Sequence, residues 1–292
     1  MSDGKRGSLS VVGLGPGAVA QMTARAREVI AAAEIVIGYK TYLRLVADLL
    51  TGKEVIASPM RAELERCAEA CRLAMAGRRV VLVSSGDAGI YGMAGPLLEM
   101  LLHAGWQPDG GVRFDVVPGV TALSACAALV GAPLTHDFCA ISLSDLLTPW
   151  PRIEKRLEAA AAADFVTALY NPRSGRRTWQ IERARSVFLR HRAPATPVAL
   201  VTAAYRETQA VILTTLATMD VASLNMQSTV LIGNQRTFVR AGLMITPRGY
   251  TDKYDLDDHL VAGDHADPDA IAGADSSSSS SSSSGSETPS AS

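Results

Sequence analysis

The sequence predicts an α/β protein with two α/β domains, the first built on a mostly parallel sheet and the second on a mixed sheet. Short apolar runs alternate with amphipathic helical segments, which is typical of strands covered by helices. Several apolar runs end in glycine-rich turns, and the alternation restarts after Gly131-Ala132-Pro133. We therefore expect a first domain at residues 8–134, a second at residues 135–250, and a ligand cleft between them.

The composition favours a well-packed core and excludes several classes of partner. Of 292 residues, 48% are hydrophobic and 20% are charged, and 28 Lys and Arg nearly balance 29 Asp and Glu. A net charge of −1 provides no field for nucleic acid. The sequence has no apolar run of about 18 residues and no signal-peptide pattern. We expect a cytoplasmic protein that binds neither nucleic acid nor a membrane.

The first predicted domain is a parallel sheet whose strands alternate with helices. Thr23 has the hydroxyl of a good N-cap, and Gly77 follows a helical segment as glycine commonly does. The expected strands are residues 9–13, 35–37, 80–84 and 114–117, and the expected helices are residues 23–33, 61–76 and 121–130.

The second predicted domain contains more strands, some of them closely spaced. Two short apolar runs flank residues 207–209, which predicts an antiparallel hairpin and hence a mixed sheet. A proline suits the first turn of the helix that begins near Pro151. The expected strands are residues 139–143, 165–170, 198–202, 211–213 and 229–232, and the expected helices are residues 151–163 and 178–190.

The two ends of the chain differ in character from the domains. We expect residues 1–7 to be disordered, and residues 251–292 to form a low-complexity tail that contains an unbroken serine run at 276–284. Such a tail cannot bury enough apolar surface to offset the entropy of ordering.

The cysteines do not predict a metal site. Cys67 and Cys71 lie four residues apart on a helical segment, where they could face the same side. No second pair of Cys or His ligands lies nearby, and a structural zinc site needs four ligands. We expect buried thiols and no metal.

The first glycine turn, residues 13–18, fits the Gly-x-Gly-x-x-Gly/Ala dinucleotide fingerprint. Two features oppose a nicotinamide-dependent oxidoreductase. Pro16-Gly17 delays the helix that should follow the turn at once, and the second strand ends in Gly38-Tyr39-Lys40 without the acid that binds ribose. The oxidoreductase stays as a competing hypothesis, as does a protein that binds its ligand without turnover.

Two more glycine-rich turns follow strands at residues 84–92 and 118–122. In both, the chain passes from a predicted strand toward a helix, so backbone amides are free to meet a polar ligand. Because turns at the carboxyl ends of neighbouring parallel strands converge, we expect one ligand site formed from all three glycine turns. Asp87 in the second turn either shapes the loop or takes part in proton transfer.

These turns resemble the tetrapyrrole methylase family, and the resemblance covers residues 8–250. Further motifs are similar to the branch of that family that methylates carbon 17 of a corrin precursor and contracts its ring. The motifs occur in order in both halves of the chain: Gly-Leu-Gly-Pro-Gly at 13–17, Gly-Tyr-Lys-Thr-Tyr at 38–42, Ser-Ser-Gly-Asp-Ala-Gly-Ile-Tyr-Gly at 84–92, Pro-Gly-Val-Thr-Ala at 118–122, His-Asp-Phe at 136–138, Ile-Ser-Leu-Ser-Asp-Leu-Leu-Thr-Pro-Trp at 141–150, Tyr-Asn-Pro-Arg-Ser at 170–174 and Met-Ile-Thr-Pro-Arg-Gly-Tyr at 244–250.

The resemblance implies the tetrapyrrole methylase fold, a homodimer, and S-adenosylmethionine as the methyl donor, which leaves as S-adenosylhomocysteine. The substrate it implies is a small-molecule tetrapyrrole, either metal-free or carrying cobalt. The residues it implies for the cofactor are Ser85, Gly86, Asp87, Ile90, Tyr91, Thr121, Ala122, Tyr170, Ala199 and Thr246.

The implied substrate bears many carboxylates, so basic side chains are expected to bind it. Ring contraction begins with removal of a hydroxyl proton, which needs a general base. The substrate candidates are Gly15 and Pro16 in the first turn, with Lys40, Arg61, Arg173 and Arg248. The candidates for proton transfer are Asp87, His136 and Asp145, with Tyr39 and Ser144 as hydrogen-bonding partners.

Overall fold

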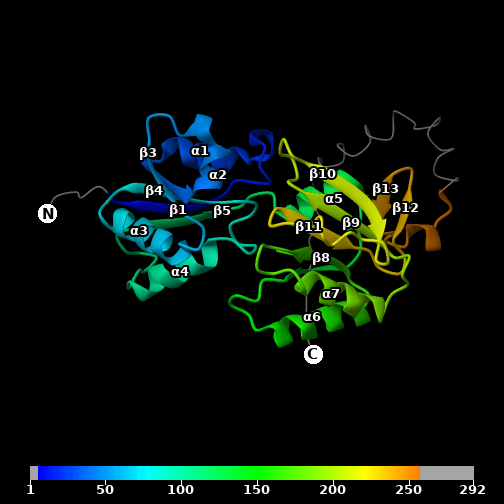
Figure 1. Ribbon diagram of the computed structural model, residues 1–292. Coiled ribbons are helices and arrows are strands. Elements are labelled where there is room, and N and C mark those ends of the chain that lie inside the picture. Colours follow the sequence, from blue (N-terminus) through cyan, green and yellow to red (C-terminus); the bar gives the residue numbers. More distant parts are fainter. Residues whose placement is uncertain (1–5, 257–292) are drawn as a thin grey trace, which may run out of the picture. The chain divides into compact units, whose positions relative to one another are not determined.

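A computed structural model describes residues 6–256 (Figure 1). The chain groups into one compact unit that ends at Arg248 and a second that starts at Gly249. The serine run and most of the predicted low-complexity tail lie outside the described residues, as do residues 1–5 of the predicted disordered N-terminus. The division at residue 134 stays a prediction.

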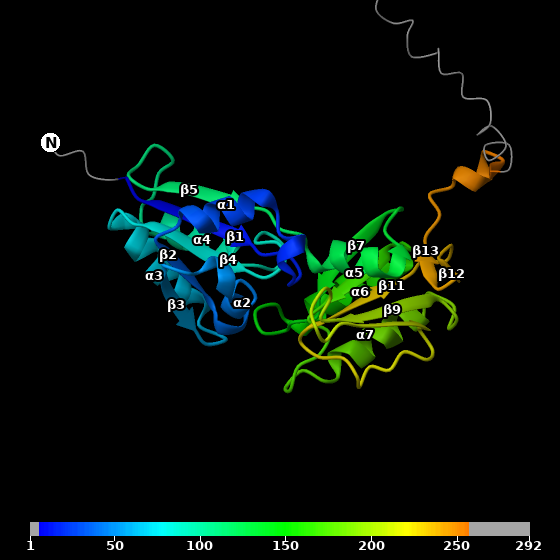
Figure 2. The same ribbon diagram turned by 90° about the horizontal axis from the view of Figure 1, so that it is seen from above.

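The first sheet has five strands, all parallel, in the order β3-β2-β4-β1-β5 (Figure 2). Its central strands are continuous apolar runs, as expected for strands that are covered on both faces. The predicted parallel sheet is thus confirmed. The strands are β1 Ser8–Gly13, β2 Ile35–Tyr39, β3 Glu54–Ser58, β4 Arg79–Ser84 and β5 Arg113–Val117.

Helices lie on both faces of this sheet (Figure 1). One core cluster packs alternate strand residues such as Val12 and Val81 against α1 and α2, and another packs Leu9 and Leu82 against α3 and α4. The Thr23 side chain accepts a bond from the amide of Ala26 at 3.1 Å, so the predicted N-cap is confirmed. The helices are α1 Ala24–Ala32, α2 Lys40–Arg44, α3 Glu63–Met75 and α4 Ala94–His103.

The second sheet also has five strands, in the order β10-β9-β11-β8-β7. Only β7 and β8 are parallel, and β9 and β10 form the predicted antiparallel hairpin, so the sheet is mixed as expected. Helices α6 Trp150–Ala162 and α7 Gln180–Leu189 pack against it. The strands are β7 Phe138–Ser142, β8 Val166–Tyr170, β9 Pro197–Thr202, β10 Ala210–Thr215 and β11 Ser228–Ile232.

Helix α5 (Ala122–Val130) packs on the second sheet and not on the first. Its buried residues Leu123 and Cys126 share a core cluster with Ala168 and Val201 of that sheet. The expectation that this helix completes the first half is therefore wrong. Periodicity shows that a helix has an apolar face, but it does not show which sheet will cover that face.

Several short elements are not visible in the sequence pattern. A three-stranded sheet joins β12, β13 and β6, and its strands have two or three residues each. Within residues 6–256, none of the helices is long and apolar enough to cross a bilayer. The short elements are β6 Gly131–Ala132, β12 Phe238–Arg240, β13 Leu243–Ile245 and the 3-10 helices η1 Val19–Gln21, η2 Ala47–Leu49 and η3 Tyr250–Asp252.

Candidate functional site

The three glycine turns meet at the carboxyl ends of β1, β4 and β5, which are neighbours in the first sheet. The amide of Gly15 donates to the carbonyl of Gly86 at 3.0 Å, and the amide of Gly86 donates back to Gly15 at 2.8 Å. Both glycines have a left-handed backbone, with φ of 74° and 66°. We call residues 13–18, 84–92 and 118–122 together the glycine-turn edge.

Asp87 ties the second and third turns together. Its Oδ1 accepts a bond from the amide of Gly89 at 2.7 Å, and its Oδ2 accepts one from the amide of Gly119 at 2.9 Å. A Cβ on Gly119 would lie 2.2 Å from the carbonyl oxygen of Gly86, so this contact requires glycine. Both carboxylate oxygens thus serve the geometry of the glycine-turn edge.

Tyr170, at the end of β8, joins the second sheet to the start of α5. Its hydroxyl lies 2.6 Å from Oγ1 of Thr121 and accepts a bond from the amide of Leu123 at 2.8 Å. It therefore satisfies an amide in the first turn of α5, which has no partner within the helix. Burial raises the pKa of Tyr170, while its bonds to Thr121 and Leu123 lower it by less.

Tyr91 and Ile90 provide an aromatic and an apolar surface beside the second turn. The hydroxyl of Tyr91 donates to the carbonyl of Ala140 at 2.9 Å, and its ring centroid lies 5.0 Å from that of Tyr170. Burial raises the pKa of Tyr91. Ile90 is 40% exposed and Tyr91 54% exposed, so both present surface to a ligand.

These residues fit a small ligand with both polar and apolar parts. A Cβ placed on Gly86 would face the backbone of Val120, Thr121 and Ala122 at 3.7 to 3.9 Å, so the missing side chain leaves a cradle there. The first amides of α5 border this cradle and suit an acceptor group. Ile90 and Tyr91 can cover an apolar ring. The combination suits S-adenosylmethionine, whose methionine part carries a carboxylate and whose adenosyl part carries hydroxyls and an aromatic base.

Two predicted cofactor residues do not reach this cradle. Ala199 has no exposed surface and packs in the core cluster beneath α5. Thr246 also has none, and its hydroxyl lies 2.8 Å from that of Thr237. Both side chains are used in packing.

The backbone amides of the first glycine turn are used in hydrogen bonds within the protein. The amide of Leu14 donates to Ser84 at 2.8 Å, and Gly15 exchanges both of its bonds with Gly86. Helix α1 begins only after η1. Amides used in this way cannot hold a pyrophosphate, so the turn does not support the nicotinamide hypothesis. Gly15 and Pro16 are themselves buried.

Arg206 reaches the glycine-turn edge from the loop between β9 and β10. Its Nε donates to the carbonyl of Pro16 at 2.7 Å, and its Nη2 lies 3.2 Å from Oγ of Ser85. No pattern marks this arginine in the sequence. The nearest signal is its place just after a predicted strand.

A second polar group gathers where β7 and β8 end. The Nδ2 of Asn171 donates to Oγ of Ser142 at 3.0 Å, and Nε2 of Gln180 donates to Oδ2 of Asp145 at 2.8 Å. Gln180 is 3% exposed. We call this group the polar edge; its members are Ser142, Ser144, Asp145, Asn171, Arg177 and Gln180.

Arg177 links the members of the polar edge. Its Nε donates to the carbonyl of Asn171 at 3.1 Å, and its Nη1 lies 3.5 Å from Oγ of Ser144. Burial lowers the pKa of Arg177, and the charge of Asp145 raises it by less. Two predicted residues that are neighbours in the sequence, Ser144 and Asp145, thus both belong to the polar edge.

His136 lies at the other end of β7. The strand starts two residues after His136 and ends at Ser142, and a strand advances about 3.3 Å per residue. Its Nδ1 accepts a bond from the amide of Asp137 at 2.7 Å. Arg248 is at this far end too, because its Nη1 donates to the carbonyl of Thr135. The structure therefore does not bring His136 together with Asp145.

The remaining basic candidates are scattered. Lys40 and Arg61 are exposed, and Arg173 donates to the carbonyl of Val221 at 3.3 Å. Tyr39 makes an edge-to-face ring contact with Tyr42 at 5.2 Å. None of these contacts involves the glycine-turn edge.

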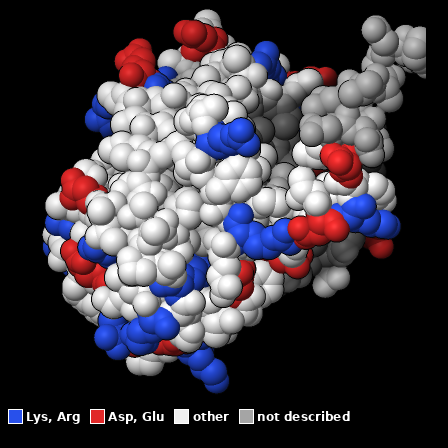
Figure 3. Space-filling model, turned by 90° about the vertical axis from the view of Figure 1, so that its right-hand side faces the viewer, with Lys and Arg blue, Asp and Glu red and all other residues white. Residues whose placement is uncertain are grey.

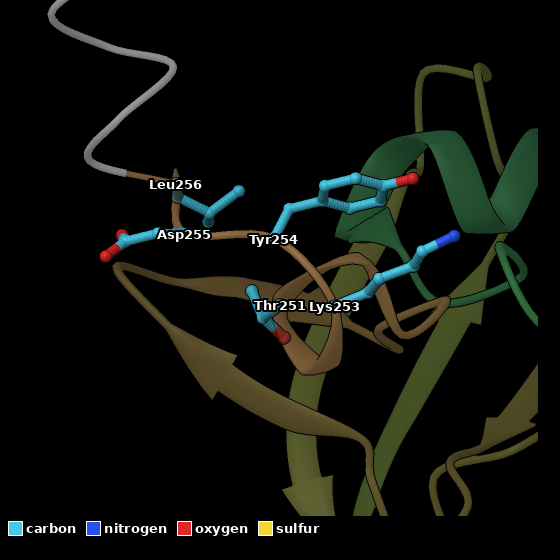
Figure 4. A pocket seen from close by; sticks show the side chains of 5 residues that line it. All are labelled: Thr251, Lys253, Tyr254, Asp255 and Leu256. Carbon is cyan, nitrogen blue, oxygen red and sulfur yellow. The ribbon is translucent and has the colours of Figure 1, made fainter.

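Two surface concavities lie elsewhere on the described residues. Charges of both signs are interspersed on the face shown in Figure 3. An open concavity on the second compact unit is lined by residues of one short segment, Thr251 to Leu256 (Figure 4). Another lies beside β1 and α1, where Arg25 is 3.5 Å from Asp115.

The cysteines are poor metal ligands in this fold. Cys67 and Cys71 are buried on α3, and burial raises their pKa to about 12 and about 11. Their thiols stay protonated near neutral pH, whereas metals bind thiolates. In the part of the chain that the structure describes, no three His, Cys, Asp or Glu side chains gather in a metal-binding group.

Comparison with known proteins identifies the class. A family model described as Tetrapyrrole (Corrin/Porphyrin) Methylases matches residues 8–220, and the chain belongs to this family. The match confirms the resemblance and the predicted fold. Because tetrapyrrole methylases use S-adenosylmethionine, it also confirms the methyltransferase class and the cofactor at the level of the family.

Relatives with related names align over most of the chain. A "Cobalt-factor III methyltransferase" of Priestia megaterium is 51% identical over 251 residues, which are 86% of this chain but 46% of that protein. The chain thus spans about half the length of this relative. A "Probable cobalt-factor III C(17)-methyltransferase" of Salmonella typhimurium is 53% identical, and the alignment covers 83% of this chain and 99% of that protein. A "Precorrin-3B C(17)-methyltransferase" of Sinorhizobium sp is 42% identical over 84% of this chain and 97% of its own.

Solved structures share the fold. A crystal structure of the methyltransferase CobJ superposes with a TM-score of 0.77 at 38% identity, covering 82% of this chain and all of that one. A uroporphyrin-III C-methyl transferase from Thermus thermophilus, complexed with S-adenosyl homocysteine, has a TM-score of 0.61 at 25% identity, covering 78% of this chain and 97% of that one.

Proposed function

We propose that this chain is an S-adenosylmethionine-dependent C(17)-methyltransferase that acts on a tetrapyrrole precursor of cobalamin and contracts its ring. The observation that carries the proposal is the glycine-turn edge, in which three turns interlock through Gly15, Gly86 and Asp87 beside the start of α5. The similarity to C(17)-methyltransferases over more than four-fifths of the chain supports it.

Two substrates fit the proposal. Precorrin-3B is the substrate that the sequence motifs imply, and a relative named for it is 42% identical. Cobalt-factor III, which already carries its metal, is favoured by relatives that are 51% and 53% identical. The two share the carboxylate-bearing ring, so one site serves either.

When bound, the cofactor would supply an electrophilic methyl group, which would form a bond with the acceptor carbon as the methyl–sulfur bond breaks and S-adenosylhomocysteine leaves. The protein's own task is positioning, because reacting atoms must approach to about 3 to 3.5 Å in line. The residues proposed to hold the cofactor are Ser85, Gly86, Asp87, Ile90, Tyr91, Thr121, Ala122 and Tyr170. Burial and hydrogen bonds fix most of them beforehand.

Asp145 is the proposed general base for the ring contraction. It belongs to the polar edge at the carboxyl end of β7, next to β8, whose last residue Tyr170 borders the cradle. Gln180 orients the carboxylate through Oδ2, which leaves Oδ1 for a substrate hydroxyl. Asp87 is proposed as a positioning residue, because backbone amides occupy both of its oxygens.

A homodimer in the cytoplasm completes the proposal. The family resemblance supports the dimer, and the balanced charge suits a cytoplasmic protein. Light scattering of the purified chain tests the dimer through its mass, for which a value of 30.7 kDa would indicate a monomer.

The direct test is turnover with S-adenosylmethionine labelled on its methyl carbon. We expect the label at carbon 17 of precorrin-3B or cobalt-factor III. Failure with both substrates, under conditions where a known enzyme turns over, would refute the proposal. Calorimetry with S-adenosylhomocysteine and NAD checks the competing hypothesis, since binding of NAD alone favours an oxidoreductase. Ring binding without any methylation favours a binding protein.

A further inference from the structure

We propose that Arg206 is a substrate-binding residue, whose guanidinium takes a carboxylate of the tetrapyrrole at the junction of the first and second glycine turns. The inference rests on the proposed function and assigns a residue to its substrate. Arg206 lies in the loop between β9 and β10, which belongs to the second sheet, yet its side chain ends on the glycine-turn edge.

The side chain of Arg206 is held in one orientation. Nε donates to Pro16 and Nη2 to Ser85, while the aliphatic stem packs on Gly17 so closely that a Cβ there would lie 2.5 Å from its Cγ. The first turn thus accommodates Arg206 through a glycine. An orientation fixed in this way lowers the entropy cost of binding a ligand.

The loop that carries Arg206 is also fixed. Ala203 and Tyr205 adopt left-handed backbone conformations, with φ of 51° and 57°, which are unusual for residues other than glycine. The amide of Arg206 donates to Ala203 at 3.0 Å, and Oε1 of Gln209 accepts from the amide of Tyr205 at 2.8 Å. Such conformations gather at functional sites.

The charge of Arg206 is not compensated. Among the described residues no carboxylate lies within ion-pair distance of it, although its guanidinium is half-buried. Burial lowers the pKa of Arg206 and the neighbouring Tyr42 raises it by less, but arginine stays protonated in proteins. A half-buried cation without a carboxylate is costly, and an anionic ligand would relieve that cost.

The hydrogen-bonding inventory leaves room for such a ligand. A guanidinium has five N–H donors, of which Pro16 and Ser85 use one each. The Nη1 donors and the second Nη2 donor remain for a carboxylate, which arginine binds in a two-pronged geometry. Arg206 contacts both the turn expected to face the substrate and the turn expected to face the cofactor.

Binding of uroporphyrin III, an octacarboxylate tetrapyrrole, tests the inference through quenching of its fluorescence. We expect Arg206→Gln to weaken this binding by about tenfold or more and Arg206→Lys to weaken it less, because lysine keeps the charge but not the fork. Binding of S-adenosylhomocysteine should stay within about twofold. The salt dependence of porphyrin binding should also fall in Arg206→Gln, because one charge contact is gone.

The matched control is Arg72→Gln, which removes an exposed arginine paired with Glu69 on α3. It should leave the affinities for uroporphyrin III and S-adenosylhomocysteine unchanged, as well as the salt dependence of porphyrin binding. The inference is overturned if Arg206→Gln binds the porphyrin like the wild type, or if it weakens both ligands equally with an unaltered salt dependence, as a purely structural role predicts. Absence of porphyrin binding to the wild type also overturns it.

The same measurements separate this inference from the proposed function. If porphyrin binding depends on Arg206 but neither precursor is methylated, the proposed methyltransferase function is wrong and substrate binding by Arg206 is upheld. Methylation by Arg206→Gln with an unchanged KM for the tetrapyrrole means that the function stands and the inference fails.

Discussion

The glycine-turn edge and the polar edge differ in whether backbone or side-chain groups form them. The first is mostly backbone: Gly15 and Gly86 exchange amide bonds, and Asp87 binds two further amides. The second is mostly side chain, with Asp145, Gln180 and Arg177 contacting one another or their neighbours. Tyr91 of the glycine-turn edge contacts Tyr170, the residue that precedes Asn171 of the polar edge.

This difference suggests a division of labour. Backbone amides are rigid and change little with sequence, so they suit a cofactor that must be held in one place. Side chains can carry a proton, so they suit the reacting part of a substrate. Substitutions at the glycine-turn edge should therefore affect binding and folding, and substitutions at the polar edge should affect turnover.

The largest effect is expected from Gly119→Ala. The new methyl group would lie 2.2 Å from the carbonyl oxygen of Gly86 and 2.8 Å from that of Gly13, both backbone atoms that cannot rotate away. We expect a loss of about 3 kcal/mol in the free energy of unfolding, the upper part of the range for overpacking, and loss of S-adenosylhomocysteine binding. Urea unfolding and calorimetry measure both.

The matched control for this substitution is Gly95→Ala in α4. A Cβ at Gly95 meets nothing within 4 Å, and the residue lies in the first turn of α4, where alanine is a better helix former than glycine. We expect stability to rise by about 0.5 to 1 kcal/mol with no change in ligand binding. If Gly119→Ala and Gly95→Ala lost equal stability and equal affinity for S-adenosylhomocysteine, the cofactor site would not depend on the backbone contacts of Gly119.

Asp145→Asn tests the polar edge. The amide oxygen can still accept the bond from Gln180, so folding and cofactor binding should be nearly unchanged. Removal of the base should lower kcat by about 100-fold or more. Exposed Asp48, on the first half of the chain, gives the control Asp48→Asn, which should be neutral. A kcat within threefold of the wild type, roughly the scatter of a surface change, would remove Asp145 from the mechanism.

Asp87→Asn tests whether the Asp87 carboxylate of the glycine-turn edge also takes part in proton transfer. An amide can accept only one of the two backbone bonds, from Gly89 or Gly119, and turns an N–H group toward the other donor. We expect affinity for S-adenosylhomocysteine to fall about tenfold, which corresponds to a loss of roughly 1.4 kcal/mol, while kcat at saturation changes less. Asp87→Ala should lose more affinity and activity. A collapse of kcat at unchanged affinity would instead make Asp87 a base.

The sequence predicts the backbone-built edge better than the edge built from side chains. Glycine turns after apolar strands are local patterns, so the convergence of the turns at Gly15, Gly86 and Gly119 follows from the parallel sheet. Arg206 reaches Pro16 across 190 positions of the chain, and no local pattern encodes such a contact. For the same reason the sheet that covers α5 was predicted wrongly, and His136 was grouped with Asp145, from which β7 separates it.

Tyr170→Phe, beside the place where Tyr91 contacts Tyr170, should have a smaller effect on cofactor affinity than Asp87→Asn. The change leaves the amide of Leu123 and the hydroxyl of Thr121 without their partner, which should cost about 1 to 2 kcal/mol and a few-fold in cofactor affinity. Tyr91→Phe removes only the hydrogen bond to Ala140, which is more exposed to solvent. It should therefore reduce stability and cofactor affinity by less.

The pH dependence of stability tests whether the hydroxyl of Tyr170 is buried in the folded protein, as its contacts with Thr121 and Leu123 require. Because burial raises the pKa of Tyr170 in the folded state, its contribution is fully present below the ordinary tyrosine value near 10. It is lost as the pH rises through the raised folded value. Tyr170→Phe should therefore lose less stability than the wild type between about pH 10 and the raised value. Identical pH profiles for the two proteins would mean that the hydroxyl of Tyr170 is not buried in the folded protein, which would contradict its contacts with Thr121 and Leu123.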